Sequence, residues 1–283
     1  MLIRLGYDLT FDLPAPTVMT TLLHVHSSRF RDLREPDLLR VEPAVNVELF
    51  HDLFGNQAAR LQLPAGTARL HGRTLIEDPG TLDEKDPSAA QVDLAYLPAN
   101  VLRYLMPSRY CEVDLLSAIA LELFGGTNPG WERVDAICDW VHTRVAFSYA
   151  KARATRGALE VFTERVGVCR DFQHLAITFC RCLNIPARYA AGYLGDILVP
   201  VAPYPMDFSA WFEVFLGGRG WTGDARHNTR RAGRVLMATG LDATDCAITT
   251  TFGASTLTNF EVISDEVPAV APRAGAVPRT ASA

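Results

Sequence analysis

Cys169 is the residue of this sequence best placed to do chemistry, as the nucleophile of a covalent reaction. It opens a stretch, residues 170–183, in which apolar side chains recur every three or four positions, as on a helix buried on one side. Gly167 and Pro186 bound this stretch, so we expect Cys169 in the first turn of a helix. Free backbone N–H groups and the helix dipole favour the thiolate there. A buried, inert cysteine is the alternative, because free cysteines are among the most buried residues.

A second segment of interest begins forty positions later. Two apolar, aromatic-rich runs, residues 208–216 and 219–223, flank a Gly-Gly pair, which predicts a β-hairpin. Ser209 lies at the start of the first run and Asp224 follows the second. The segment therefore supplies a hydroxyl and a carboxylate, but no imidazole on either predicted strand.

The motifs of both segments together resemble the bacterial transglutaminase-like superfamily, whose members are often described as cysteine proteases. The sequence reads Gly-Val-Cys-x-Asp-Phe at 167–172, Ile-Pro-Ala-Arg-Tyr at 185–189, Ala-Trp-Phe-Glu-Val at 210–214 and Asp-Ala-Arg-His-Asn at 224–228. The resemblance covers roughly residues 110–260. It implies an α+β fold, in which a papain-like core packs the cysteine-bearing helix on an antiparallel sheet. The part before this core resembles the antiparallel β domain that precedes it in many members.

In that family a cysteine, a histidine opening the first hairpin strand and an aspartate form a papain-like triad. The resemblance assigns the nucleophile to Cys169 and the imidazole-orienting role to Asp224, while the histidine position falls on Ser209. An imidazole, with an ordinary pKa of about 6.5, takes the thiol proton and then protonates the leaving amine. Serine does neither near neutral pH, so Asp224 is left with no imidazole to orient. Gly223 is a second departure, since the family commonly has a large aromatic residue there, and it predicts an altered floor of the site.

A replacement base must then come from another of the seven histidines. His227 is the leading candidate because it lies three residues after Asp224, and a loop histidine without a catalytic role is the alternative. His174 lies five residues along the helix from Cys169, which turns it away from the thiol. His142 lies in a helical pattern, so we expect a packing or surface role for it.

Length and patterning predict two domains, because 283 residues exceed the usual size of one. Alternating apolar residues at the N-terminus, followed by strand-like stretches between prolines, are typical of an antiparallel sheet. The acidic, turn-rich residues 77–87 predict an exposed loop. The predicted divisions are a β-rich domain (1–97), a connector (98–112), the transglutaminase-like core (113–263) and a disordered tail (264–283).

Composition and charge exclude several classes of function. A net charge of −5 argues against a general nucleic-acid binder. With no N-terminal signal core and no apolar run of eighteen residues, we expect neither secretion by that route nor a membrane span. The six cysteines show no disulfide or zinc spacing, which favours free thiols in a reducing cytoplasm. No metal or organic cofactor is implied.

Two functions from different classes stay open. The first is a thiol enzyme that hydrolyses an amide of a peptide or protein, or transfers its acyl group, through a Cys169 thioester, with weak or absent activity unless His227 replaces the missing histidine. The second is a non-catalytic transglutaminase-fold protein that binds a peptide or partner. An arginine cluster after Asp224, residues 226–234, predicts either an acidic ligand near the cleft or a solvated basic loop. Substrate and oligomeric state are left open.

Overall fold

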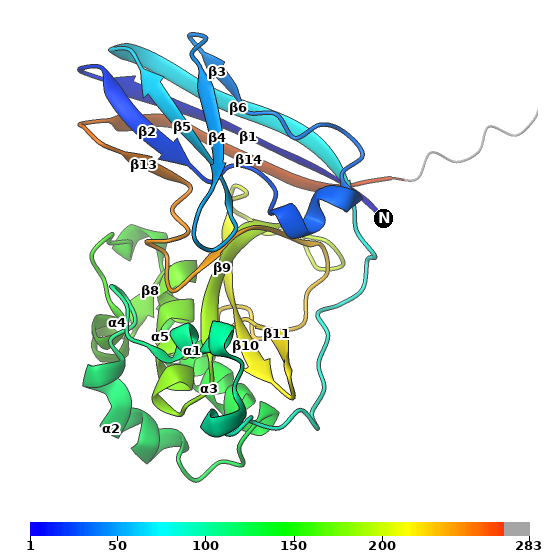
Figure 1. The fold of residues 1–283 in the computed structure, drawn as a ribbon, viewed down its shortest axis with the longest axis vertical. Coiled ribbons are helices and arrows are strands. Elements are labelled where there is room, and N and C mark those ends of the chain that lie inside the picture. The colour runs from blue at the N-terminus through cyan, green and yellow to red at the C-terminus, as the bar shows by residue number, and fades with distance from the viewer. Residues whose placement is uncertain (269–283) are drawn as a thin grey trace, which may run out of the picture.

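A computed structural model describes residues 1–268 and shows two parts, an all-β part and a mixed helical part (Figure 1). The β domain contains two four-stranded sheets, ordered β14-β1-β6-β3 and β13-β2-β5-β4. Its strands are β1 (Leu2–Leu13), β2 (Thr17–Thr21), β3 (Arg40–Glu42), β4 (Val47–His51), β5 (Gln57–Leu63), β6 (Gly66–Glu77), β13 (Thr249–Thr251) and β14 (Thr256–Val267). A short 3₁₀ turn, η1 (Ser27–Asp32), follows β2.

The two sheets share one apolar core, because each presents an alternating row of large side chains to the other. Leu5 and Leu9 of β1, Leu61 of β5 and Leu70 of β6 are at most 1% exposed and belong to one cluster. This is the alternation expected of strands with one buried face. The N-terminal pattern therefore specifies a packed pair of sheets.

The chain returns to the β domain at its C-terminal end. β14 pairs antiparallel with β1 from Leu2–Val267 to Asp12–Thr256, and β13 pairs with β2. The predicted core range of 113–263 thus includes two strands that lie in the N-terminal sheets (Figure 1). The predicted tail of 264–283 begins inside β14, and its residues 269–283 lie outside the described part of the chain.

The second part packs helices on a sheet ordered β11-β10-β9-β12. Its strands are β9 (Ala187–Leu194), β10 (Ser209–Leu216), β11 (Arg219–Gly223) and β12 (Arg234–Gly240), with a parallel pair β7 (Ala146–Phe147) and β8 (Val166–Gly167). Its helices are α1 (Ala99–Leu102), α2 (Val113–Phe124), α3 (Trp131–Arg144), α4 (Ala158–Glu164) and α5 (Cys169–Cys182), with 3₁₀ turns η2 (Leu94–Tyr96), η3 (Arg103–Leu105) and η4 (Tyr149–Lys151).

α5 is the central helix of this part, and all its residues from 171 to 181 are buried. It contacts α2, α3 and α4 as well as β9 and β10. Phe179 packs against Phe124 of α2 and Trp140 of α3, with ring centroids 5.2 and 5.5 Å apart. Such burial on all sides fixes the position of the helix start, where Cys169 lies.

The hairpin of β10 and β11 turns at Gly217 and Gly218, which have φ angles of 59° and 89°. Two consecutive positive φ angles favour glycine at both turn positions. The hairpin and the Cys169 helix, packed on an antiparallel sheet, confirm the predicted α+β class. The two parts are also packed together, since Tyr193 of β9 and Val235 and Met237 of β12 join the apolar cluster of the β domain.

Candidate active site

Cys169 is the first residue of α5 and lines a cavity of about 590 Å³. Its side chain is half-buried. The same cavity is lined by Ser209 at the start of β10 and by Asp207 just before it. It also holds Tyr149 and a second thiol, Cys246. Local sequence reasoning missed these last three residues, although the position of Asp207 two residues before Ser209 is a signal that could have found it.

The surroundings of the Cys169 thiol favour its neutral form. Burial raises its pKa to about 11, and the nearby Asp207 raises it further, while the guanidinium of Arg226 acts in the opposite direction. This direction is opposite to the stabilised thiolate that the helix start predicts. Desolvation of the charged form outweighs the helix dipole. A base must take the proton when the thiol reacts.

Alkylation of Cys169 by iodoacetamide is expected to be slow at neutral pH and to accelerate until the pH approaches 11. Because only the thiolate reacts, labelling at pH 7 should be about 10²-fold slower than that of an ordinary thiol. Peptide mass spectrometry after timed labelling measures this, with the urea-unfolded protein as the control. Rapid labelling of Cys169 at pH 6–7 in the folded protein would contradict the neutral thiol.

His227 and Asp224 form a hydrogen-bonded pair next to this cavity. Nδ1 of His227 lies 2.9 Å from Oδ2 of Asp224. A carboxylate can only accept hydrogen bonds, so Nδ1 of His227 carries a proton and donates it to this bond. Nε2 of His227 is then the nitrogen available to accept a proton. The expectation that Asp224 has no imidazole to orient is thus corrected, because His227 provides one from the loop after β11.

Asp224 is held in place from several sides. Its Oδ1 accepts the side-chain amide of Gln173 at 3.1 Å and the backbone N–H groups of Arg226 and His227 at 3.0 and 3.1 Å. Its Oδ2 also accepts Nη2 of Arg234 at 2.8 Å. Burial raises the pKa of Asp224, but the hydrogen bond from His227 and the charge of Arg234 outweigh it and hold the pKa well below its ordinary value. Asp224 is therefore a fixed anion.

The Cys169 thiol and the His227 imidazole line two adjoining pockets and not a single shared one. His227 lines a smaller pocket of about 50 Å³, and Tyr149, Asp207, Phe208 and Ser209 line both this pocket and the cavity of Cys169. Ser209, at the expected histidine position, has a buried hydroxyl without a hydrogen-bond partner among residues 1–268. The structure thus places Ser209 at the boundary between the nucleophile and the candidate base.

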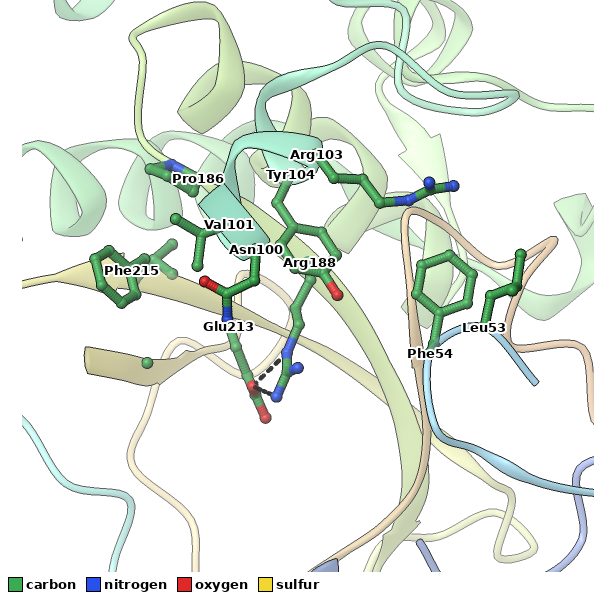
Figure 2. Close-up of a pocket in the computed structure, with 12 residues that line it drawn as sticks. Leu53, Phe54, Asn100, Val101, Arg103, Tyr104, Pro186, Arg188, Glu213 and Phe215 are labelled. Atoms are coloured by element: carbon green, nitrogen blue, oxygen red, sulfur yellow. Dashed lines mark hydrogen bonds and ion pairs between the residues drawn. The ribbon is translucent and has the colours of Figure 1, made fainter. Parts of the chain in front are cut away.

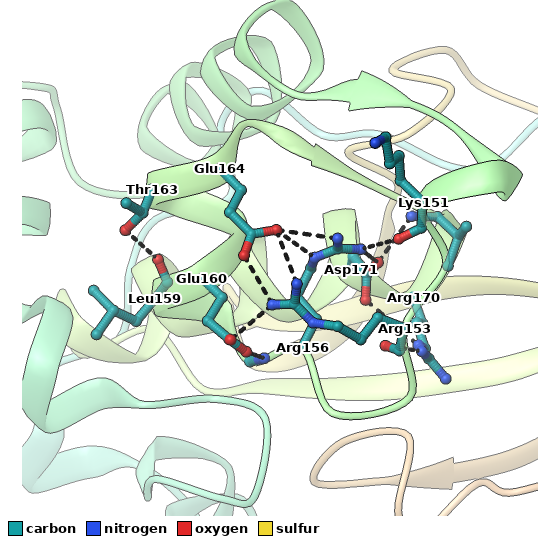
Figure 3. A network of polar contacts seen from close by, with 11 residues as sticks. Lys151, Arg153, Arg156, Leu159, Glu160, Thr163, Glu164, Arg170 and Asp171 are labelled. Carbon is teal, nitrogen blue, oxygen red and sulfur yellow. Dashed lines mark hydrogen bonds and ion pairs between the residues drawn. The ribbon is translucent and has the colours of Figure 1, made fainter.

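The start of α5 rests on a buried ion network (Figure 3). Asp171 is fully buried, and its Oδ2 accepts the backbone N–H of Val168 at 2.9 Å and Nη1 of Arg156 at 3.2 Å. Arg156, itself 2% exposed, also donates to Glu164 at 3.1 Å. Because Val168 immediately precedes the cysteine, this network fixes the backbone that presents the thiol.

Replacing Asp171 with asparagine is expected to destabilise the protein by about 3 kcal/mol, because it leaves a buried guanidinium without one of its counter-charges. Glu160→Gln is the matched control, since the Glu160 side chain is 45% exposed in its ion pair with Arg153 and such pairs contribute about 0–1 kcal/mol. Urea denaturation measures both free energies of unfolding. Equal stabilities of the two variants would show that the buried pair does not support the helix start.

The other histidines singled out in the sequence lie outside the site. His174 is fully buried and stacks on Tyr110, with ring centroids 4.8 Å apart. Burial lowers its pKa to about 3, and Nε2 accepts the backbone N–H of Ala243. His142 is exposed on α3, with Nδ1 2.8 Å from the carbonyl oxygen of Arg226.

Gly223 leaves no empty floor in the site. A Cβ atom at this position would lie 2.5 Å from Cζ of Phe212. Phe212 is fully buried and pairs with Gly223 across the hairpin. The ring of Phe212 therefore fills the space next to Asp224 that a larger residue at position 223 would need.

A second large cavity, of about 450 Å³, lies against the same sheet (Figure 2). Arg188 and Glu213 form an ion pair at 2.6 Å on one of its walls. Arg103 lies over the ring of Phe54, 5.1 Å from its centroid. None of the predicted site residues lines this cavity.

Residues 1–268 hold neither a metal-binding group of side chains nor a membrane-spanning helix. Within this range, there is no group of three or more His, Cys, Asp or Glu side chains that could hold a metal ion. No helix of the same range is both long and apolar enough to cross a membrane. All six cysteines are unpaired.

Comparison with known proteins gives a consistent result. Residues 117–223 match the family model of the transglutaminase-like superfamily. A crystal structure described as a putative cysteine protease from Cytophaga hutchinsonii is 30% identical and superposes with a TM-score of 0.83, covering 95% of this chain and 92% of that one. An uncharacterised protein of Mycobacterium leprae (strain TN) is 25% identical over 222 residues, which are 74% of this chain and 78% of that protein. The chain therefore belongs to the transglutaminase-like superfamily.

Proposed function

We propose that the protein is a thiol enzyme that cleaves an amide of a peptide or protein and passes the acyl group to water or an amine. The observation that carries this proposal is the 2.9 Å contact between Nδ1 of His227 and Oδ2 of Asp224. It restores an imidazole–carboxylate pair beside the cavity of Cys169, although the usual histidine position holds Ser209. The similarity to the Cytophaga hutchinsonii protein supports the same class of chemistry.

The proposed reaction starts from a neutral thiol. As Sγ of Cys169 attacks the carbonyl carbon, Nε2 of His227 takes the thiol proton, and Asp224 stabilises the imidazolium that forms. Backbone N–H groups at the start of α5 stabilise the oxyanion. The imidazolium then protonates the leaving amine, the C–N bond breaks, and a thioester remains on Cys169. Water or a second amine attacks this thioester and restores the thiol.

This proposal sets one geometric requirement. Because the imidazole and the thiol line adjoining pockets, Nε2 must reach Sγ past the shared wall that includes Ser209 and Phe208. A substrate seated in the cavity of Cys169 would contact this same wall. We therefore propose that the reacting carbonyl lies between Cys169 and Ser209.

The second candidate function is a non-catalytic protein that binds a peptide or partner in the cavity of Cys169. Two observations favour it: the pKa of the Cys169 thiol is raised to about 11, and the histidine position is occupied by Ser209. Such a protein needs the cavity of about 590 Å³ but no base. For either function we propose a reducing compartment such as the cytoplasm, where free thiols persist.

The test is amide cleavage by the full chain, measured as amine released from a pool of peptides. A thiol enzyme releases amine. If it is a transferase, adding an acceptor amine changes its other product from a free acid to a new amide. In the binding protein, no amine is released, yet a peptide binds equally well to the wild type and to Cys169→Ala. Ser209→His then supplies the missing imidazole and should create cleavage where none existed.

A further inference from the structure

The segment that leaves the β domain after β6 is largely exposed, as the sequence predicts, but the side chain of Asp83 within it is only 13% exposed. The segment runs beside the sheet of the core on its way to α1 (Figure 1). The backbone N–H of Asp83 donates a hydrogen bond to the carbonyl oxygen of Arg231 at 2.7 Å. In return, the backbone N–H of Arg231 donates to Oδ2 of Asp83 at 3.0 Å. Its carbonyl oxygen accepts Nε of Arg230. These contacts fix Asp83 against the loop that follows the candidate base.

The side chain of Asp83 begins a chain of charged contacts that ends at the imidazole. Both its carboxylate oxygens lie 3.0 Å from Nε of Arg234. Nη2 of Arg234 lies 2.8 Å from Oδ2 of Asp224, the oxygen that also accepts Nδ1 of His227. The side chains of Asp83, Arg234 and Asp224 are 13%, 7% and 3% exposed. Water therefore screens these contacts weakly.

We propose that Asp83 is a positioning residue for the Asp224–His227 pair and acts through Arg234. This inference rests on the proposed function, because it concerns the base of the same site. It also gives the segment between the two domains a role in the reaction. For the arginine cluster at residues 226–234, the sequence predicts contact with an acidic ligand or with solvent. Three of its members, Arg230, Arg231 and Arg234, instead contact Asp83 of the same chain.

Arg234 and His227 both donate to Oδ2 of Asp224 and therefore compete for it. A guanidinium prefers to give two parallel N–H groups to one carboxylate. Asp83 occupies Nε of Arg234, so only Nη2 reaches Asp224. Without Asp83, Arg234 is free to turn both groups onto Asp224 and to displace His227 from Oδ2. Asp83 thus leaves an acceptor for the imidazole.

The β domain supports the same arrangement from the other side. Nη1 of Arg29, in η1, donates to the carbonyl oxygen of Arg234 at 3.1 Å. Nη2 of Arg29 binds the carboxylate of Asp78, at the start of the connecting segment, at 3.2 Å. One arginine of the β domain therefore holds both the segment and the backbone of Arg234.

The test uses Asp83→Asn in the full chain, with Glu84→Gln as the matched control. Glu84 is the neighbouring acid, is 71% exposed, and pairs with Arg219 outside this chain of contacts. Nitrogen-15 NMR of the labelled histidines reports whether Nδ1 of His227 donates to a carboxylate. We expect this signal in the wild type and in Glu84→Gln, its loss in Asp83→Asn, and its recovery in Asp83→Glu. In amide cleavage, Asp83→Asn should lower kcat about 10- to 100-fold with KM little changed.

Arg234→Lys is the second variant, for the case in which Asp83→Asn does not fold. A lysine keeps the charge but has no fork that could take both oxygens of Asp224, so His227 should keep its hydrogen bond to Asp224, and its signal, in this variant. An unchanged His227 signal in folded Asp83→Asn, or loss of the signal in folded Arg234→Lys, would overturn the inference. A wild-type protein without cleavage but with the expected changes in the His227 signal would instead reject only the proposed function.

Discussion

Cys169→Ala is expected to lower amide cleavage by about 10³-fold or more, because it removes the sulfur that is proposed to form the thioester. Cys246→Ala is the matched control. Cys246 lines the same cavity, and its replacement by alanine also removes one thiol group. However, Cys246 is only 4% exposed, and burial raises the pKa of its thiol well above the ordinary value. The initial rate of amine release measures both variants.

The Cys246→Ala control shows whether the loss of activity is specific to the sulfur of Cys169. Cys246→Ala should retain most of the activity, and both variants should show wild-type circular dichroism. Full activity in Cys169→Ala would place the nucleophile elsewhere. Loss of activity in Cys246→Ala alone would move it to the other thiol of the cavity.

His227→Gln is expected to lower kcat/KM by about 10²–10⁴-fold, the usual contribution of a positioned general base. A glutamine amide can still donate to Asp224 but cannot take the thiol proton. The loss should appear mainly in kcat, since His227 lines the pocket next to the cavity of Cys169 rather than the cavity itself. Steady-state kinetics on a cleaved peptide measure the two constants.

His142→Gln is the control for this variant. The His142 imidazole also contacts the loop after β11, at the carbonyl of Arg226, but it does not contact Asp224. Its replacement should change kcat/KM by less than about threefold, as for surface changes away from a site. Equal effects of the two substitutions would mean that the loop, and not the imidazole of His227, supports the reaction.

The elements that carry the site follow from local sequence signals. Gly167 and Pro186 bound the apolar stripe, and the observed helix covers Cys169–Cys182 between them. The Gly217-Gly218 pair predicts the hairpin, whose strands end at Leu216 and begin at Arg219. Such signals are short-range, so they survive in a single sequence.

Features that depend on distant contacts were not predictable in the same way. β14 pairs with β1 from Leu2–Val267 to Asp12–Thr256, on opposite ends of the described chain, and no local pattern assigns a C-terminal strand to an N-terminal sheet. The pKa of Cys169 depends on the residues that bury it and on Asp207, which lies on another element. The helix start alone therefore predicts a thiolate, whereas burial in the folded protein raises the pKa of the thiol and favours its neutral form.

The role of Asp83 shows the same limit at the level of single charges. An acidic, turn-rich stretch is typical of a solvated loop, yet Asp83 meets Arg234 from 151 positions away. His227 was a candidate from its spacing to Asp224, and the folded chain brings their side chains into contact. Whether this pair acts as the base stays a prediction.

The most direct test of the central claim is mass spectrometry of the intact protein after brief exposure to an activated peptide ester, followed by peptide mapping. One added acyl group is expected on Cys169 in the wild type, with no adduct at this position in Cys169→Ala and strongly slowed formation in His227→Gln. An adduct on another cysteine, an unmodified protein, or equal acylation rates in the wild type and His227→Gln would contradict the central claim.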